Sequence, residues 1–450
     1  MEKPYVLIKS AKKKAMQKVK VIGGGLAGCE ATYYLATHGI AVDLYDIKPS
    51  KFTPAHKSQN FAELVCSNSL KSNDVYGNAS GLMKEEMRLL GSLIIESGDK
   101  NRVPAGNALA VDRENFANYI TQKIKDLPNV KVFSEEVTKI PFDEYTIIAT
   151  GPLTTDALSE SIKKIVGDGL SFYDASAPIV DFSSIDMNNA FFGDRYGKGE
   201  ADHINCPMNK EQYLEFISEL TKAECATLHD FEKTEVFEGC MPIEIMASRG
   251  LDTLRFGPLK PAGLTDPKTG RWPYACLQLR KEDASGSMYN MVGFQTNLKW
   301  GEQKRVFSII PALKNAEYLR YGVMHKNTFI NSTKVLNDDY SLKSNDKIFF
   351  AGQITGVEGY VESAGSGLLV AIYLERKLNG KKHVRISENT VLGALTKYVT
   401  TENPNFQPMN ANFGILPPLD MIIRDKAERK KKMAERSLKL INEFMTEIQL

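Results

Sequence analysis

A short apolar strand that runs directly into a glycine-rich turn and a helix is the feature that most constrains this chain. The strand is predicted over 19–22, and the turn Gly23-Gly24-Gly25-Leu26-Ala27-Gly28 follows it in the pattern G-x-G-x-x-G. Such glycines let a pyrophosphate approach the backbone at the N-terminus of the helix, which we predict over 26–37 with Gly39 ending it. A second predicted strand, over 40–46, ends in Asp46, 18 residues after Gly28 and near the spacing at which a carboxylate binds a ribose hydroxyl. The head of the chain predicts a dinucleotide-binding Rossmann unit; an ordinary tight strand-to-helix turn is the alternative for the fingerprint taken alone.

Two later segments carry further glycine-rich turns, in the order typical of a two-domain flavoprotein. One predicted strand, over 146–149, ends in Thr150-Gly151-Pro152. Another, at 349–351, leads into Gly352-Gln353 and then into Gly359 and a helix start that contains Ser363 and Gly365. Three such elements in chain order favour FAD over NAD as the bound nucleotide. The middle of the chain has no second G-x-G-x-x-G, so we expect a nicotinamide reductant to bind only transiently.

Length and pattern divide the chain into a split domain and an insertion. A chain of 450 residues exceeds one ordinary core, and between about 168 and 333 the pattern changes to short strands, aromatic residues and turns. We predict an α/β fold with a basic N-terminal extension over 1–17, a discontinuous FAD-binding domain over 18–167 and 334–450, and an inserted α+β substrate domain over 168–333. In the split domain we also predict helices over 83–95, 113–127 and 424–436, and a strand over 130–133.

Composition limits the partners and the compartment. The formal net charge of +2 identifies no partner by itself. No apolar run approaches the roughly 20 residues that a membrane-spanning helix needs, and the lysine-rich head lacks the apolar core of a signal peptide. The six cysteines are scattered without metal-type spacing, which predicts no metal site and reduced thiols in the cytoplasm.

Two of the six cysteines lie among polar, turn-forming neighbours, and these two are the candidates for chemistry. Cys66 lies in Glu63-Leu64-Val65-Cys66-Ser67-Asn68-Ser69, and Cys240 lies between Gly239 and Met241-Pro242. A thiolate is the reactive form of cysteine, so each would need a basic or cationic environment. The remaining cysteines are expected to be small buried apolar residues: Cys29, Cys206, Cys225 and Cys276.

The chain also resembles a known family over nearly its whole length, from about residue 19 to the C-terminal region. It is similar to the TrmFO family, GidA-related methyltransferases that use flavin and folate to make 5-methyluridine in RNA. The shared motifs are the turn at 23–28, Thr53-Pro54-Ala55-His56, the segment 63–69, Ala108-Leu109-Ala110-Val111-Asp112-Arg113, Phe237-Glu238-Gly239-Cys240-Met241-Pro242, Leu298-Lys299-Trp300-Gly301, Gly322-Val323-Met324-His325, the segment 327–332, Gly356-Val357-Glu358-Gly359-Tyr360 and the segment 405–414. The resemblance implies a FAD-binding domain of the GidA and glutathione-reductase type.

The resemblance implies a reaction as well. Methylenetetrahydrofolate would give its methylene group to FAD reduced by NAD(P)H, and carbon 5 of a uracil would receive it. Cys240 matches the cysteine that attacks uracil carbon 6, and Cys66 matches the cysteine beside the flavin, with the split of roles between the two left open. His325 is the candidate to stack on the pterin. The inserted domain would thus bind folate, with Trp300, Lys299 and Asn331 as further candidate folate or substrate residues.

The same resemblance leaves the RNA target open. The T-loop uridine of tRNA is the first expectation and a large-subunit ribosomal RNA uridine the second, because Asn297 stands where we expect histidine, Lys71 and Lys326 stand for arginine, and Gly365 stands for alanine. The candidate RNA contacts are Lys51, Lys57, Lys71, the lysines of the head, Arg424, Lys426, Arg429, Lys430, Lys431, Lys432 and Arg436. For the last seven, from Arg424 to Arg436, a solvated helix face is the alternative. The assembly is expected to be a monomer or a homodimer.

Two other functions remain as alternatives: an NAD(P)H-dependent flavin oxidoreductase, and an RNA-binding flavoprotein without methyltransferase activity. Retention of both Cys66 and Cys240 argues against the first. The second would be expected to have a longer C-terminal helical region, as in the GidA family.

Overall fold

The structure is a computed structural model. It describes residues 17–53, 55–167, 170–175, 177–197, 201–226, 241–282, 285–322, 324–403 and 406–449, and for 170–175 and 324–328 it describes the backbone only. The predicted basic extension over 1–17 therefore lies outside the described residues except for Gln17.

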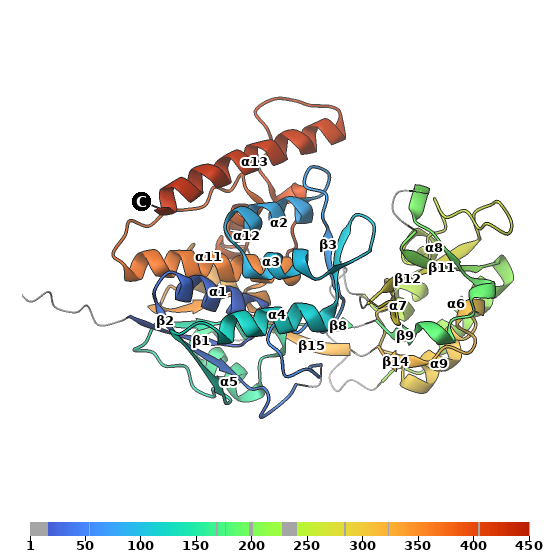
Figure 1. The fold of residues 1–450 in the computed structure, drawn as a ribbon, viewed down its shortest axis with the longest axis horizontal. Coiled ribbons are helices and arrows are strands. Elements are labelled where there is room, and N and C mark those ends of the chain that lie inside the picture. Colours follow the sequence, from blue (N-terminus) through green and yellow to red (C-terminus); the bar gives the residue numbers. More distant parts are fainter. Residues whose placement is uncertain are drawn as a thin grey trace, which may run out of the picture.

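The larger unit is built on one sheet to which both ends of the chain contribute (Figure 1). Its strand order is β16-β17-β7-β1-β2-β6, with parallel pairing from β17 through β6 and an antiparallel edge pair of β16 and β17. The strands are β1 (Lys18–Ile22), β2 (Ala41–Asp46), β6 (Val130–Ser134), β7 (Thr146–Ile148), β16 (Ser341–Leu342) and β17 (Asn345–Phe350). Since Phe350 of the late strand pairs with Ile148 of the early one, the two halves of this unit share one sheet and one core.

Helix α1 (Leu26–Thr37) packs closely on α11 (Tyr360–Leu378) against this sheet. The close approach requires glycine, because a Cβ at Gly367 would lie 2.3 Å from the carbonyl oxygen of Ala27. The predicted bounds of α1 are confirmed, and Gly39 has the positive φ (+80°) of a residue that ends a helix.

The remaining elements of the larger unit cover the two helices and the sheet edges. They are α2 (Ala79–Leu89), α3 (Leu93–Lys100), α4 (Arg113–Lys125), α5 (Asp156–Val166), α10 (Ser332–Val335), α12 (Val391–Thr400), α13 (Lys426–Gln449), and a small antiparallel sheet of β3 (Ser69–Ser72), β5 (Ala108–Val111) and β4 (Arg102–Val103). The single helix predicted over 83–95 is wrong. Gly91 takes φ +77°, and Ser92 caps a new helix by accepting from the Ile95 amide, so the chain forms α2 and α3 instead.

The smaller unit has its own sheet and its own core (Figure 1). The sheet is antiparallel, in the order β10-β11-β12-β13-β9-β14. Its strands are β9 (Ile179–Asp181), β10 (Phe191–Phe192), β11 (His203–Met208), β12 (Ala275–Lys281), β13 (Met288–Met291) and β14 (Tyr318–Arg320), and its helices are α6 (Lys210–Lys222), α7 (Ile243–Ser248), α8 (Thr253–Phe256) and α9 (Trp300–Phe307). We call this part, from 177 to 322, the inserted unit.

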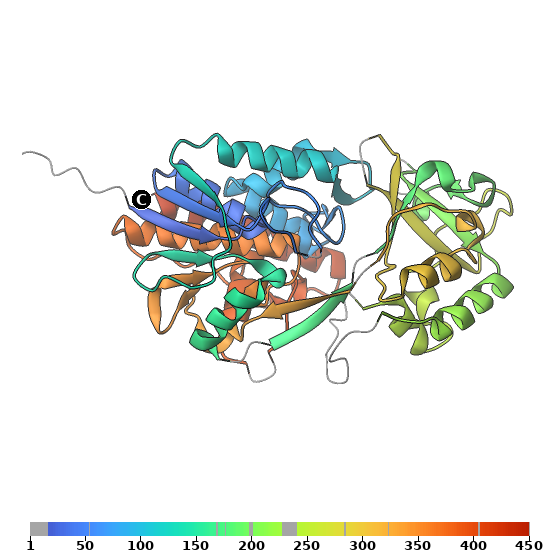
Figure 2. The same cartoon turned by 90° about the horizontal axis from the view of Figure 1, so that it is seen from below.

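The two units are joined by a pair of antiparallel strands, β8 (Leu170–Ala175) and β15 (Met324–Phe329). Figure 2 shows both strands extending between the larger unit and the inserted unit, and their chain directions are opposite. The chain thus leaves and re-enters the larger unit side by side, which places the start and the end of the insertion next to each other.

Of the cysteines expected to be buried, Cys29, Cys206 and Cys276 are buried. The expectation for Cys225 is wrong, because this residue is exposed. It lies just beyond the end of α6, where it forms a β-bridge with Leu298. In the described part of the chain, no helix is long and apolar enough to cross a membrane, and no group of three or more His, Cys, Asp or Glu side chains is arranged to hold a metal ion.

Candidate flavin and cysteine site

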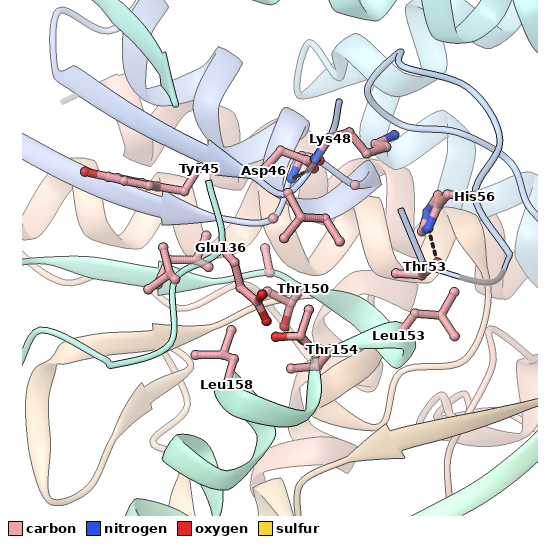
Figure 3. A pocket seen from close by; sticks show the side chains of 18 of the residues that line it. Tyr45, Asp46, Lys48, Thr53, His56, Glu136, Thr150, Leu153, Thr154 and Leu158 are labelled. Carbon is pink, nitrogen blue, oxygen red and sulfur yellow. Dashed lines mark hydrogen bonds between the residues drawn. The ribbon is translucent and has the colours of Figure 1, made fainter. Parts of the chain in front are cut away.

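A pocket lies at the carboxyl ends of β1, β2 and β7 (Figure 3), and Gly23, Gly24 and Gly25 of the glycine turn line it. Gly23 has φ +107°, and a Cβ there would lie 2.6 Å from the carbonyl oxygen of Ala149. A Cβ at Gly28 would lie 1.8 Å from the carbonyl oxygen of Gly23. Gly25 differs, since the nearest atom to its Cβ position is 4.0 Å away. Gly23 and Gly28 therefore allow the turn to close, and Gly25 leaves room for a ligand.

The N-terminus of α1 opens toward this room. Its cap residue, Gly25, provides no side-chain acceptor, and no acidic residue lies in the first turn, which contains the buried Leu26 and Ala27. The first amides of a helix lack intrahelical partners and carry partial positive charge. Phosphate oxygens would accept hydrogen bonds from these amides, as expected for the pyrophosphate of a dinucleotide.

Asp46 lies at the end of β2, among the residues that line the pocket. Its carboxylate accepts hydrogen bonds from the backbone amides of Gly24 (2.7 Å) and Lys48 (2.8 Å). These two bonds tie the acid to the glycine turn and hold it in one orientation, while a carboxylate has further lone pairs for a ribose hydroxyl. The opposite wall contains Thr150 and Thr154, whose hydroxyls lie 2.6 Å apart (Figure 3).

Three later glycines, Gly151, Gly352 and Gly359, extend the glycine-lined surface beyond this pocket; we call this surface and the turn at 23–28 the glycine cradle. Gly151, with φ +65°, directly follows Thr150. Gly352 (φ +84°) lies where a Cβ would meet that of Ala27 at 2.9 Å, and Gly359 (φ +124°) precedes α11. Gln353 lies beside this turn and donates to Glu358 (2.7 Å). These conformations favour glycine and keep the backbones of α1 and α11 close to the place where a dinucleotide would extend.

The first turns of α11 contain two more of the predicted cofactor residues and one buried acid. Ser363 is buried in this turn. Gly365 contacts helices instead of the pocket, because its Cβ would meet Met83 and Leu392 at 2.5 and 2.7 Å. Glu362 is fully buried, and its Oε2 has no hydrogen-bond partner among the described residues. The open space at Gly25 and the uncapped N-terminus of α1 fit the pyrophosphate of FAD.

Cys66 lies in a loop whose backbone is held by side chains from distant parts of the chain. Arg113 donates to the carbonyl oxygens of Leu64 (2.6 Å) and Cys66 (3.4 Å), and Arg320 donates to that of Val65. The Tyr360 hydroxyl accepts from the amides of Cys66 (2.7 Å) and Ser67 (3.2 Å). We call residues 64–68 the cysteine loop.

The next two residues of the cysteine loop are bound by the inserted unit. Arg280 donates to the Ser67 hydroxyl (2.7 Å) and to the Asn68 side-chain oxygen (3.1 Å), and the Asn68 amide donates to the Lys281 carbonyl oxygen (2.8 Å). Buried Glu282 accepts from Arg113 at 2.6 Å and so closes the contact between the two units. The cysteine loop therefore lies at the junction of the larger and inserted units.

Sequence reasoning did not identify Tyr360, Arg280 or Arg320 as site residues. Arg280 and Arg320 lie in strands with no motif around them, and they contact residues 213 and 255 positions away in the chain. Tyr360 carried a signal, because it directly follows Gly359 in a segment shared with the TrmFO family.

Cys240 lies outside the described residues, and for His325 the structure describes only a backbone position in β15. The chain is described on either side of 227–240, and Asn297 binds one residue on each side, Ala226 and Glu244. Asn297 donates from its side chain to the Ala226 carbonyl oxygen (3.1 Å), and its backbone amide donates to Glu244 (2.7 Å). Burial raises the pKa of Glu244, against the hydrogen bonds from Asn297 and Thr296. Asparagine at 297, where histidine was expected, thus supports the backbone that leads toward Cys240.

The other candidate folate or substrate residues lie in two separate places. Trp300 begins α9, is 62% exposed and stacks on Tyr321, which directly follows Arg320. Lys299 points to Glu224 (2.6 Å) at the surface. Asn331 begins α10 of the larger unit and accepts from the Thr333 hydroxyl (2.7 Å). Arg320 binds Val65 of the cysteine loop, and the next residue, Tyr321, stacks on Trp300. Trp300 is therefore connected to the cysteine loop through these two neighbouring residues.

The candidate RNA contacts differ in whether their charged groups are bound to other residues of the protein or exposed. Lys71 pairs with the buried Glu362 at 2.7 Å, and Lys430 donates to the Gly77 carbonyl oxygen (2.8 Å). Lys57 and Arg429 are exposed. The remaining candidates lie in the described chain as follows: Lys51 pairs with Glu136 (2.7 Å), Arg436 donates to the carbonyl oxygens of Pro417 and Pro418, Lys432 pairs with Glu435 (2.9 Å), and Arg424, Lys426 and Lys431 are exposed.

Comparison with known proteins gives matches over nearly the whole chain. The family model described as Glucose inhibited division protein A matches residues 18–382. A protein of Lactobacillus gasseri named methylenetetrahydrofolate–tRNA-(uracil-5-)-methyltransferase TrmFO is 56% identical over 437 residues, which are 97% of this chain and 100% of that protein. A protein of the same name from Listeria welshimeri is 57% identical over 434 residues, covering 96% of this chain and 100% of that protein.

Among solved structures, GidA of Aquifex aeolicus superposes with a TM-score of 0.68 at 16% sequence identity. The match covers 95% of this chain and 76% of that chain. This likeness confirms the predicted fold class: a Rossmann-like α/β unit of the GidA type, divided by an inserted α+β unit.

Proposed function

The chain belongs to the TrmFO family, and on this premise we propose that it methylates carbon 5 of a uracil in tRNA, with methylenetetrahydrofolate as carbon donor and FAD as cofactor. NAD(P)H is the proposed reductant. We place the reaction in the cytoplasm, because its proposed substrate is tRNA, and we propose that residues 168–333 form the domain that binds substrate and folate.

The observation that carries the proposal is the attachment of the cysteine loop to the start of α11. Tyr360 is the first residue of this helix, and the residue before it, Gly359, belongs to the glycine cradle. Because the Tyr360 hydroxyl accepts from the Cys66 amide at 2.7 Å, Cys66 is held beside the helix that would face the cofactor. A reactive cysteine at the cofactor is what a folate- and flavin-dependent methyl transfer needs, and a simple oxidoreductase does not need it.

Each group of the protein would then have its own role in the reaction. The glycine turn and the N-terminus of α1 bind the pyrophosphate, and Asp46 binds a ribose. Cys240 attacks carbon 6 of the uracil, which makes carbon 5 nucleophilic, and Cys66 acts at carbon 5 by removing its proton or guarding the transferred carbon. When bound, FAD supplies the electrons that turn a methylene group into a methyl group. Afterwards the Cys240 thiolate leaves carbon 6.

For the RNA target, tRNA is favoured over ribosomal RNA. One reason for keeping ribosomal RNA open was Lys71 in place of arginine. In the structure Lys71, whose side chain is 40% exposed, pairs with the buried Glu362, so its charge is already bound to a carboxylate of the protein. Lys57 and the exposed residues of α13 are the proposed RNA contacts.

The test is a methylation assay of the FAD-loaded protein with methylenetetrahydrofolate and NADPH on unmodified tRNA and, side by side, on unmodified ribosomal RNA. We expect 5-methyluridine in tRNA, and Cys240→Ala should lower its formation at least about 1,000-fold while the protein stays yellow with bound FAD. The matched control is Cys225→Ala, which removes an exposed thiol of the same unit and should keep full activity. Methylation supported by S-adenosylmethionine alone, or full activity of Cys240→Ala, would contradict the proposal.

A further inference from the structure

Three guanidinium groups surround the cysteine loop, and two of them belong to the inserted unit. Arg113 comes from the start of α4, Arg280 from β12 and Arg320 from β14. All three bind atoms of residues 64–68 directly, so their charged ends lie around Cys66.

Few negatively charged side chains among the described residues lie near these three guanidinium groups. In the described part of the chain, the carboxylate among them is Glu282, which Arg113 already binds at 2.6 Å. Among the described side chains, the Tyr360 phenol also interacts with Cys66; burial raises the pKa of this phenol, so that it stays neutral at ordinary pH. One carboxylate therefore balances three guanidinium charges, and a second anion would be stabilised here.

The buried arginines themselves indicate where that anion belongs. Burial lowers the pKa of Arg280, with Glu282 opposing this effect, and burial followed by repulsion from Arg113 lowers that of Arg320. A negative charge on Cys66 raises the pKa of all three arginines. Attraction between two charges is mutual, so the arginines favour the thiolate of Cys66 over its thiol.

We propose that Arg280 and Arg320 are positioning residues that hold Cys66 as a thiolate when the inserted unit lies against the larger unit. The proposal rests on the proposed function for its meaning in the reaction, since there a charged Cys66 can take a proton from carbon 5 of the uracil. Without these two arginines, the guanidinium that the described residues leave at the cysteine loop is that of Arg113, which pairs with Glu282. The charge state of Cys66 thus depends on Arg280 and Arg320, two side chains of the inserted unit.

The proposal is tested by alkylation of Cys66 with iodoacetamide in the FAD-loaded protein, followed peptide by peptide with mass spectrometry between pH 5 and 10. The wild-type protein is expected to show a midpoint of alkylation below the ordinary value for cysteine of about 8.5. Arg280→Gln and Arg320→Gln should each raise this midpoint by about one pH unit and slow alkylation at pH 7 about tenfold. Arg280→Lys restores the charge and should bring the midpoint back toward the wild-type value.

Two matched variants separate charge from structure. Ser67→Ala removes the hydroxyl that Arg280 binds but leaves the charge in place, so the midpoint should not move. Arg255→Gln removes an arginine of the same unit that pairs with Asp252 away from the cysteine loop, and it should not move the midpoint either. Bound FAD and melting temperature identify variants that fail to fold.

Unchanged midpoints in Arg280→Gln and Arg320→Gln, or equal shifts in Ser67→Ala, would overturn the proposal. The readout needs no methylation. If Arg280→Gln and Arg320→Gln shift the midpoint as expected but the wild-type protein methylates no tRNA, this inference stands and the proposed function is refuted.

Discussion

At the scale of single residues, the glycines of the turn at 23–28 show how closely backbone atoms must approach to form the candidate FAD site. Gly28 is the sharpest case, because a Cβ there would lie 1.8 Å from the carbonyl oxygen of Gly23, and neither backbone atom can move without opening the turn. The first turn of α1 would then shift away from the place of the pyrophosphate.

Gly28→Ala is therefore expected to weaken FAD binding. Overpacking of this kind costs about 1–3 kcal/mol, which corresponds to about a 5- to 150-fold loss of affinity. FAD titration of the apoprotein, followed by flavin fluorescence, measures the effect. Gly301→Ala is the matched control, because no atom lies within 4 Å of its Cβ position and it is in the inserted unit. Equal FAD affinity of Gly28→Ala and wild type would show that the turn does not hold the cofactor.

At this scale the sequence identifies candidate residues where a position depends on its chain neighbours. Gly23, Gly25 and Asp46 were identified from their spacing, since the turn and the strand that follow are local. Tyr360 was not identified as a partner of Cys66, because the two residues are 294 positions apart and no local pattern records the contact.

At the scale of elements, buried carboxylates join helices that are far apart in the chain. Glu86 of α2 accepts from the first amides of α12, those of Val391 (2.8 Å) and Leu392 (2.9 Å), and from the Ser437 hydroxyl of α13. Burial raises the pKa of Glu86 to about 7, against these three hydrogen bonds. One side chain thus caps one helix and fastens another to the larger unit.

Glu86→Ala should lower the free energy of unfolding by about 2–4 kcal/mol, because it leaves buried amides without an acceptor. Glu86→Gln keeps one acceptor oxygen and should cost less. Urea denaturation of the FAD-loaded protein measures both. Glu85→Ala, which removes a neighbouring surface partner of Arg88, should stay within about 0.5 kcal/mol of wild type. A cost for Glu86→Ala as small as that of the control would mean that α12 and α13 do not depend on this acid.

Helix boundaries show the same division between local and distant causes. α1 was predicted with its observed bounds, because an apolar run, a glycine turn and a stop glycine all lie within it or beside it. The prediction over 83–95 merged two helices. The break at Gly91 has a local signal in Gly91-Ser92, but the start of α3 is also held from outside by Glu30, which accepts from the amides of Leu93 and Ile94.

At the scale of the whole molecule, the contact between the two units is short, polar and centred on the cysteine loop. Arg113 and Glu282 form its buried ion pair, and the Gly106 amide donates to Asp202 (3.0 Å) elsewhere in the contact. A buried pair of this kind is costly to break from one side, because the remaining charge is left without a partner.

Glu282→Ala is expected to lower the free energy of unfolding by about 3 kcal/mol and to slow methylation, because Arg113 holds the carbonyl oxygens of Leu64 and Cys66. Melting curves and methylation rates on tRNA measure the two effects. Asp252→Ala breaks the exposed pair with Arg255 in the same unit and should change stability by at most about 1 kcal/mol. Wild-type stability of Glu282→Ala would show that the two units do not depend on this pair.

The sequence by itself determined the Rossmann-type head, the return of its pattern at 345–367, the presence of an insertion and the two candidate cysteines. Each of these is recorded in residues that lie near one another in the chain, as glycine spacing, strand and helix periodicity, or a continuous motif. The tertiary structure decided how Cys66 is held, that Lys71 pairs inside the protein, and that Arg280 and Arg320 surround the cysteine loop. These features arise because folding brings together residues more than 200 positions apart, and the charge of a buried group depends on the neighbours that folding gives it.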